Sequence, residues 1–462
     1  MNLNHKFKHL HIGIPDIILR LKKAGDFKKA IELIDIKLKK EDLPKSMYDS
    51  LFVQRQIMKR LPENYPYTRE EAIGKIQEYI SDFTEKEFDE RVLNEEIDWI
   101  YIRGIPRYFN RFYETMIRTD PDFATRAGEK NVISDGSSIG SDGKEDPLNC
   151  IVEDIQKNGS VSNRITVRAS VQIKDEHFQP GEVVRVHLPI PCNCLQQSQI
   201  NIEKIEPYDG EIAPEDAPQR TIYWERQMKE NQPFIVEYSY IYTSKYHDIH
   251  SIIPDNKQPS FHTHEQPPHI MFTPYIQELA ESLTKGLDSS LEKARAIYDF
   301  ITLNVKYSFM RSYFCLENIP EKGALNLKGD CGVMALMFIT MCRYVGIPAR
   351  WQSGLITRPD FCGAHDWAMF YIAPYGWLYA DPSFGAGAVR EENEKKRQFY
   401  FGNLDSFRMV ANNEFQHDFT NTKRFWRADP YDNQVGEIET LNRGLRYHEF
   451  DSYKKVIKYK KL

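Results

Sequence analysis

The segment from Gly329 to Ser383 places the strongest constraint on what this chain can fold into. It opens with GDC and continues in an apolar stretch, CGVMALMFITMCRYVG, which predicts a helix ended by Gly346 and Pro348. Three short runs with strand character follow, RWQSGLI, DWAMFYIA and GWLYAD. One buried helix followed by several short strands predicts a mixed α+β core, which we place at residues 270–390.

Three side chains of this segment have the chemistry of a catalytic relay. Cys331 lies where a glycine-containing loop enters the predicted helix, and the unpaired N–H groups and partial positive charge of a helix start favour a thiolate. His365 lies at the start of one predicted strand and Asp381 at the end of the next. A hairpin of these strands would bring both side chains to one edge of the sheet. The order of nucleophile, base and orienting acid is that of a Cys–His–Asp relay.

These blocks together resemble the transglutaminase-like superfamily of papain-related thiol enzymes, in a bacterial-type multidomain form. The family pattern is Gly-x-Cys opening a helix, Gly-Ile-Pro-Ala-Arg after it, His-x-Trp on a strand, and Gly-Trp before Asp-Pro-Ser/Thr. The chain carries every block in this order, as Gly329-Asp330-Cys331, Gly346-Ile347-Pro348-Ala349-Arg350, His365-Asp366-Trp367, Gly376-Trp377 and Asp381-Pro382-Ser383. The resemblance implies that Cys331 is the nucleophile, His365 the general base and acid, and Asp381 the group that orients the imidazole.

A tetrahedral intermediate also needs donors for its oxyanion. The backbone N–H of Cys331 is the natural first donor. Family members often place an aromatic or polar donor upstream of the cysteine, which makes Tyr307 the candidate for the second, with a core tyrosine as the equal alternative. Asp366 follows His365 directly, so we expect it on the opposite side of the strand and not as the acid of the triad.

The resemblance implies acyl transfer at an amide or peptide bond through a thioester on Cys331. If water resolves the thioester, the chain is a cysteine peptidase or amidase, which the resemblance favours, and its partner is a peptide or protein substrate. If an amine resolves it, the chain is a protein-glutamine transglutaminase. A non-catalytic interaction scaffold is a further alternative, and the presence of all three triad residues argues against it.

The flanking regions predict further units. Residues 1–132 have helical periodicity, including a capping-box pattern from Thr68 to Glu71. Residues 133–147 are rich in Gly, Ser and Asp and predict a linker or loop. Residues 160–250 alternate apolar and polar side chains between turn signals, which predicts an antiparallel β domain. Residues 391–462 have weaker periodicity and a lysine-rich end, so we expect a C-terminal extension with a solvated end.

Composition narrows the partners and the compartment. Lys and Arg number 61 and Asp and Glu 67, a net charge of −6, so neither nucleic acid nor a membrane is an expected partner. No apolar run is long enough to span a bilayer, and the N-terminus lacks the pattern of a signal peptide. The seven cysteines are an odd and sparse set, which predicts a cytoplasmic protein and no disulfide framework.

Metal ligation has weak support in the sequence. The short clusters Cys192-x-Cys194 and His262-x-His264-Glu265 each lack a partner pair at the spacing of a zinc site. We therefore expect neither a metal nor another cofactor. The oligomeric state has no signature in the sequence.

Overall fold

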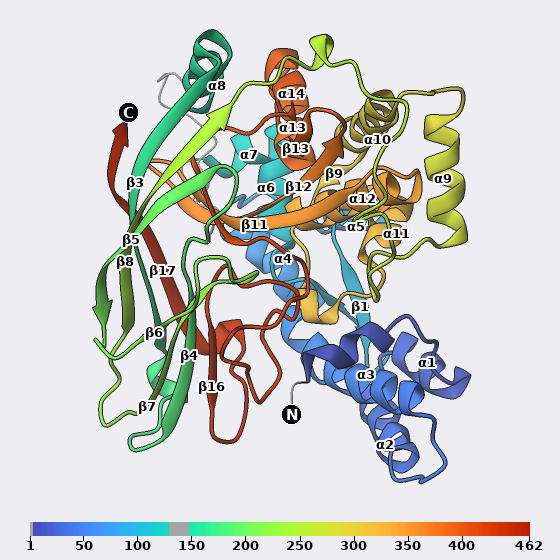
Figure 1. Cartoon of the computed structure of the whole chain (residues 1–462). Coiled ribbons are helices and arrows are strands. Elements are labelled where there is room, and N and C mark those ends of the chain that lie inside the picture. Colours follow the sequence, from blue (N-terminus) through green and yellow to red (C-terminus); the bar gives the residue numbers. More distant parts are fainter. Residues whose placement is uncertain (1–2, 129–146) are drawn as a thin grey trace.

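The computed structural model describes residues 3–128 and 147–462 and combines helices with mainly antiparallel sheets (Figure 1). This confirms the predicted mixed α+β fold class. The linker expected at 133–147 lies, except for Pro147, outside the described residues. None of the helices in the two described ranges has the length and apolar character that crossing a membrane requires.

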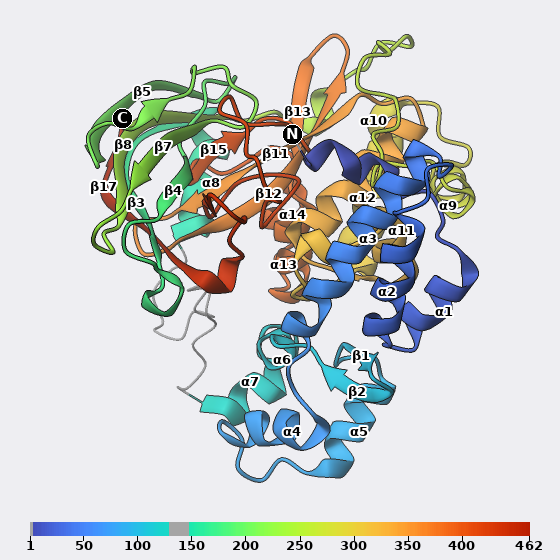
Figure 2. The ribbon, with the colours of Figure 1, turned by 90° about the horizontal axis from the view of Figure 1, so that it is seen from below.

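Helices dominate the N-terminal part. Its elements are η1 (Asn4–His9), α1 (Asp16–Lys23), α2 (Phe27–Lys37), α3 (Lys45–Asn64), α4 (Arg69–Gln77), α5 (Glu85–Leu93), β1 (Trp99–Ile102), β2 (Ile105–Tyr108), α6 (Phe112–Thr119) and α7 (Pro121–Ala127). Figure 2 shows α4 to α7 and the β1–β2 hairpin gathered at one end of the molecule. Thr68 and Glu71 form the predicted capping box at the start of α4.

A two-stranded hairpin interrupts the region 1–132, for which we expected helices. Trp99–Ile102 and Ile105–Tyr108 pair as antiparallel strands around a turn in which Gly104 has a φ of +75°. Aromatic and β-branched side chains favour strands, and a left-handed backbone at Gly104 suits a tight turn rather than a helix.

Two four-stranded antiparallel sheets face each other as a sandwich. One sheet has the order β17-β3-β8-β5 and the other β16-β4-β7-β6. The strands are β3 (Ser160–Ile173), β4 (Val183–Pro189), β5 (Gln197–Glu206), β6 (Glu211–Ile212), β7 (Thr221–Gln227), β8 (Phe234–Lys245), β16 (Glu437–Thr440) and β17 (Phe450–Lys461). Alternate side chains such as Val167, Val186, Trp224 and Tyr238 meet in a shared apolar core.

The C-terminal segment 391–462 differs from the expected extension, because it contributes one strand to each of the two sheets of the sandwich. β16 pairs with β4, and β17 pairs with β3 over most of its length. Phe450 and Val456 are the two buried residues of β17, while most of its lysines are exposed. Lysines on an outer strand fit an edge position, where they discourage pairing with another chain.

The third unit contains the predicted core. Its sheet has the order β14-β13-β12-β11-β15, formed by β11 (Ala349–Thr357), β12 (Cys362–Ile372), β13 (Gly376–Ala380), β14 (Phe401–Gly402) and β15 (Arg408–Asn412). The surrounding helices are α8 (Pro147–Asn158), α9 (Pro274–Thr284), α10 (Ser290–Asn304), α11 (Ile319–Asn326), α12 (Cys331–Tyr344), α13 (Pro382–Arg390) and α14 (Glu394–Phe399). The expected hairpin of two strands is the antiparallel pair β12–β13.

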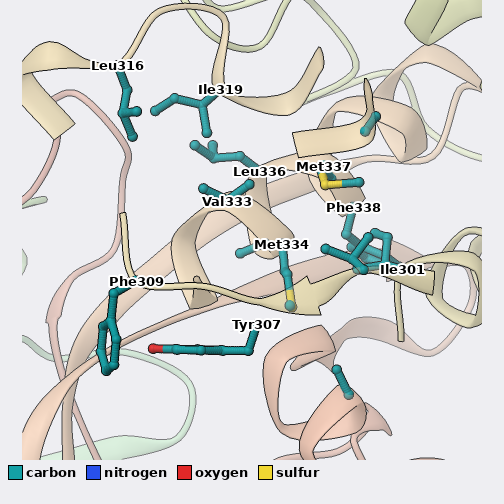
Figure 3. Packing of buried hydrophobic residues seen from close by; sticks show 14 of the residues in the cluster. Ile301, Tyr307, Phe309, Leu316, Ile319, Val333, Met334, Leu336, Met337 and Phe338 are labelled. Atoms are coloured by element: carbon teal, nitrogen blue, oxygen red, sulfur yellow. The ribbon is translucent and has the colours of Figure 1, made fainter. Parts of the chain in front are cut away.

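Helix α12 lies between this sheet and the other helices. Figure 3 shows Val333, Met334, Leu336, Met337 and Phe338 of α12 among Ile301, Leu316 and Ile319 of the neighbouring segments. On the other side of α12, the ring of Phe338 lies 5.5 Å from the ring of Phe370 on β12. A helix that is buried on all sides is apolar on all sides. The segment of α12 from Val333 to Cys342 has this character.

Candidate active site

Cys331 is the first residue of α12 and is partly exposed. The side chain of Asp330 caps the helix by accepting a hydrogen bond from the backbone N–H of Val333 at 3.1 Å. Gly332 leaves no space beside the thiol, because a Cβ there would approach the Tyr313 hydroxyl and the Asp366 carboxylate within 3 Å. The helix start expected from the sequence is therefore present at Cys331.

His365 and Asp381 meet as the resemblance implies. Nε2 of His365 lies 2.8 Å from Oδ2 of Asp381, and the two residues are 5% and 0% exposed. His365 lies on β12, and Asp381 directly follows β13, so the hairpin brings them together. Because Nε2 is hydrogen-bonded to the Asp381 carboxylate, Nδ1 is the ring nitrogen that can exchange a proton with another group.

Asp381 is fixed by two further groups. Its Oδ1 accepts the backbone N–H of Phe384 at 2.9 Å and caps α13, and its Oδ2 lies 2.7 Å from Nη1 of Arg408. Arg408 is fully buried and also binds Asp405. Burial alone would raise the pKa of Asp381, but the interactions with His365 and Arg408 lower it to about 2. The carboxylate is therefore ionised over the whole physiological range.

The thiol has a different neighbour from the one expected. Cys331 Sγ donates to Oδ2 of Asp366 at 3.3 Å, and within residues 3–128 and 147–462 no hydrogen bond joins Cys331 to His365. Consecutive strand residues point to opposite faces of a sheet. Phe370, on the same face as Asp366, packs against α12. Asp366 therefore lies on the face of β12 that meets α12. His365 lies on the opposite face, together with Trp367, which is part of the core of the sandwich.

Carboxyl groups surround the thiol. Gln434 Nε2 donates to Asp366 Oδ1 at 2.6 Å, and Ser353 Oγ donates to Asp432 Oδ2 at 2.5 Å on the same side of the sheet. Loss of hydration raises the pKa of Asp366 well above its usual value, and the neighbouring charge of Asp432 raises it further. The pKa of Asp330 is raised by burial to about 6.

These surroundings oppose the thiolate that the helix start favours. Loss of hydration, and then the charges of Asp366 and Asp330, raise the pKa of Cys331 well above its usual value. The expectation from the helix dipole was therefore incomplete, because it left out acidic side chains that reach the thiol from β12 and from the helix cap itself.

The variant Asp366→Asn should make Cys331 more reactive. The amide keeps the shape of the side chain and removes a charge that raises the pKa of the thiol. The pH midpoint of iodoacetamide labelling should therefore fall, and labelling at a fixed pH below that midpoint should become faster. Labelling of the Cys331 peptide is followed by mass spectrometry between pH 6 and 10. The control is Asp360→Asn, an exposed carboxylate paired with Arg358. An unchanged midpoint in Asp366→Asn would show that this carboxylate does not set the reactivity.

Tyr307, the expected second oxyanion donor, lies on the short strand β9 (Lys306–Tyr307), beside β10 (Lys328–Gly329). Its ring stacks 4.2 Å from the Arg118 guanidinium and edge-on to Phe309 at 5.4 Å. Figure 3 shows Tyr307 and Phe309 beside the first turn of α12. These contacts give Tyr307 a packing role, and its role as a donor stays a prediction.

Two residues at this site had no motif in the sequence. The hydroxyl of Tyr313 donates to Asp330 Oδ1 at 2.5 Å, which places it directly beside the N-cap of α12. Arg408 comes from a strand of the C-terminal segment, RMVAN, and its importance comes only from the pairing of β15 with β11. A charged residue beside the apolar run of residues 409–411 was the one signal that could have singled out Arg408.

Across the two described ranges, no three His, Cys, Asp or Glu side chains are grouped as ligands for a metal ion. Cys192 is buried in the sandwich core, and His262 packs its ring 5.8 Å from that of Trp377. All seven cysteines are free thiols.

Comparison with known proteins supports the resemblance in the core. Residues 277–382 match the family model of the transglutaminase-like superfamily, and this range contains Cys331, His365 and Asp381. The search of curated proteins finds no match. The recognition made from the sequence blocks is thus confirmed for this segment.

Two solved structures show similarity at low identity. The first is described as "a Putative Cysteine Protease from Cytophaga hutchinsonii", with 14% identity and a TM-score of 0.37 over 65% of this chain and 91% of that chain. The second is the periplasmic domain of TgpA from Pseudomonas aeruginosa, with 14% identity and a TM-score of 0.28 over 56% of this chain and 99% of that chain.

Proposed function

Because residues 277–382 match the transglutaminase-like superfamily, we propose that the chain is a thiol hydrolase of amide bonds, a cysteine peptidase or amidase. In this proposal Cys331 is the nucleophile, His365 is the general base and acid, and Asp381 orients the imidazole. The observation that carries the proposal is the buried His365–Asp381 pair at 2.8 Å, with Asp381 held by Arg408. A partly exposed thiol at the start of α12 completes the set.

The reaction follows from the positions of the protons. Nδ1 of His365 takes the proton of the Cys331 thiol, and the sulfur forms a bond to the carbonyl carbon of the amide. As the tetrahedral intermediate collapses, the C–N bond breaks, the imidazolium gives its proton to the leaving amine, and a thioester remains. His365 then takes a proton from water, whose oxygen attacks the thioester, and the C–S bond breaks to give the carboxylic acid and the free thiol.

This sequence requires the thiol to exchange its contact with Asp366 for one with His365. Because His365 and Asp366 lie on opposite faces of β12, this exchange requires the end of β12 or the start of α12 to move, and the proposal assigns that movement to substrate binding. Apo sites often hold their catalytic hydrogen bonds loosely and tighten them with substrate.

The proposal is tested with a quenched fluorescent peptide library, incubated with and without a fluorescent primary amine. Hydrolysis predicts new peptide termini by mass spectrometry and no incorporated amine. Incorporated amine without cleavage would show a transglutaminase instead, because an amine in place of water would have resolved the thioester.

A non-catalytic interaction module is the second candidate, and one observation favours it. The thiol is hydrogen-bonded to Asp366, and loss of hydration together with the carboxylates around it raises its pKa, which disfavours the thiolate that a nucleophile needs. Under this reading, Cys331 in the unsubstituted chain labels with iodoacetamide no faster than an ordinary thiol, and the peptide library shows neither cleavage nor amine incorporation.

A further inference from the structure

A cavity of about 370 Å³ lies outside the core that matches the family. Gln56 and Arg60 of α3 form one wall, Phe425 and Trp426 a second, and the segment 442–449 before β17 the third. Its volume is within the usual range for a small-molecule site. The two ends of the chain therefore build this cavity together.

Positive charge exceeds negative charge around the cavity. Arg60, Arg443 and Arg446 line it, while Glu449 is the acidic residue of the lining. Glu449 is bound by Arg443, with Nη1 and Oε1 2.6 Å apart. Arg446 pairs with Glu63, which is not part of the lining. After these pairs are formed, the charge of Arg60 remains without a carboxylate partner among the described residues.

Arg60 is 5% exposed, an unusual position for a cation. Its Nη1 donates to the carbonyl of Arg427 at 3.1 Å, and its guanidinium lies 3.4 Å over the ring of Phe314. Its Nε is buried and has no hydrogen-bond partner in the described part of the chain. Loss of hydration and the nearby charge of Arg446 lower the pKa of Arg60 to about 10. A buried charge without a counterion is costly, and an anion in the cavity would offset that cost.

We propose that this cavity binds a small organic oxyanion, a phosphate ester or a carboxylate, whose charged group pairs with Arg60 and Arg446. Guanidinium groups present planar pairs of N–H donors that match these oxygens. The uncharged part of the ligand lies against Trp426 and Phe425, whose rings give it an apolar wall.

The test is titration calorimetry on the full chain at low ionic strength, with AMP, citrate and inorganic phosphate as separate probes. We expect AMP or citrate to bind at one site with a dissociation constant below about 1 mM, a usual range for small charged ligands. Binding of AMP alone assigns a phosphate ester, and binding of citrate alone assigns a carboxylate. Inorganic phosphate should bind more weakly than either, because it has no part that contacts the aromatic wall.

Three variants locate the site. Arg60→Met and Arg446→Gln should weaken binding at least about tenfold, because each removes one of the paired cations. Arg424→Gln is the matched control: it removes an exposed arginine two residues from Trp426 that does not line the cavity, and it should bind like the unsubstituted chain. If Arg60→Met does not fold, Arg446→Gln decides. No binding of any probe up to 10 mM, or equal binding by the lining variants, would overturn the proposal.

Discussion

Cys331→Ala should abolish amide hydrolysis, with a loss of about 10⁴-fold or more in turnover, while the chain remains folded. The loss is large because no other group of the site can form the thioester, and removing the nucleophile leaves only the contribution of binding and of oxyanion donors. The helix start is already capped by Asp330, and alanine is a good helix former, so α12 should begin where it does now. Turnover is measured with the best peptide from the library.

The matched control is Cys362→Ala. Cys362 is another partly exposed free thiol, and it lies on β12, the strand that also carries His365. It should keep turnover within about twofold, because its side chain packs against the core of the sandwich and has no role in the proposed reaction. A residual rate in Cys331→Ala within tenfold of the unsubstituted chain would place the nucleophile elsewhere, and equal losses in both variants would point to structural damage.

Local sequence signals were sufficient for the elements of the core. The helix starting at Cys331 could be predicted because the residues that begin and end it are close in sequence. A glycine-containing loop precedes it, and Gly346 and Pro348 follow it. The β12–β13 hairpin could be predicted for the same reason, since its two strands are neighbours in the chain. The pair His365–Asp381 followed directly from that hairpin.

The face of β12 that meets α12 could not be predicted. Its sequence, HDWAMFYI, is apolar on both faces beyond the first two residues, because the strand is buried on both sides. Alternation then tells that His365 and Asp366 point in opposite directions, but it does not tell which of them faces the helix. The contact between Cys331 and Asp366 depends on that choice.

Long-range strand pairing also had no sequence signal. β16 and β17 pair with strands that lie 250 residues or more before them in the chain. The hydrophobic period of a strand does not show which strand it pairs with. The same limit applies to Arg408, which reaches Asp381 because β15 pairs with β11. An edge strand exposes one face, so its short apolar pattern resembled that of a solvated end.

Arg408→Met should reduce the free energy of unfolding by about 3–5 kcal/mol, the usual cost of removing one partner from a buried ion pair. Arg408 is fully buried and holds two buried carboxylates, with Nη1 2.7 Å from Asp381 and Nη2 2.6 Å from Asp405. Methionine has a similar length and no charge, so it leaves little empty space. The decrease in the free energy of unfolding therefore arises mainly from the two carboxylates that have lost their counterion. Urea unfolding at pH 7 measures it, with Arg226→Met as the control for an arginine paired at the surface with Asp209, where about 0–1 kcal/mol is usual.

The same variant should also change how stability depends on pH. In the unsubstituted chain the pKa of Asp381 is lowered from 3.8 to about 2, so its contribution is fully present above about pH 4 and is lost as the pH falls towards 2. Without Arg408 the pKa of Asp381 rises, because burial is then opposed by His365 and the backbone N–H of Phe384 without the charge of the arginine. The loss of stability between about pH 4 and pH 2 should therefore be smaller in Arg408→Met, whereas Arg226→Met should keep the original profile. An Arg408→Met chain as stable as the unsubstituted one at pH 7, with the same acid profile, would mean that Asp381 does not depend on this arginine.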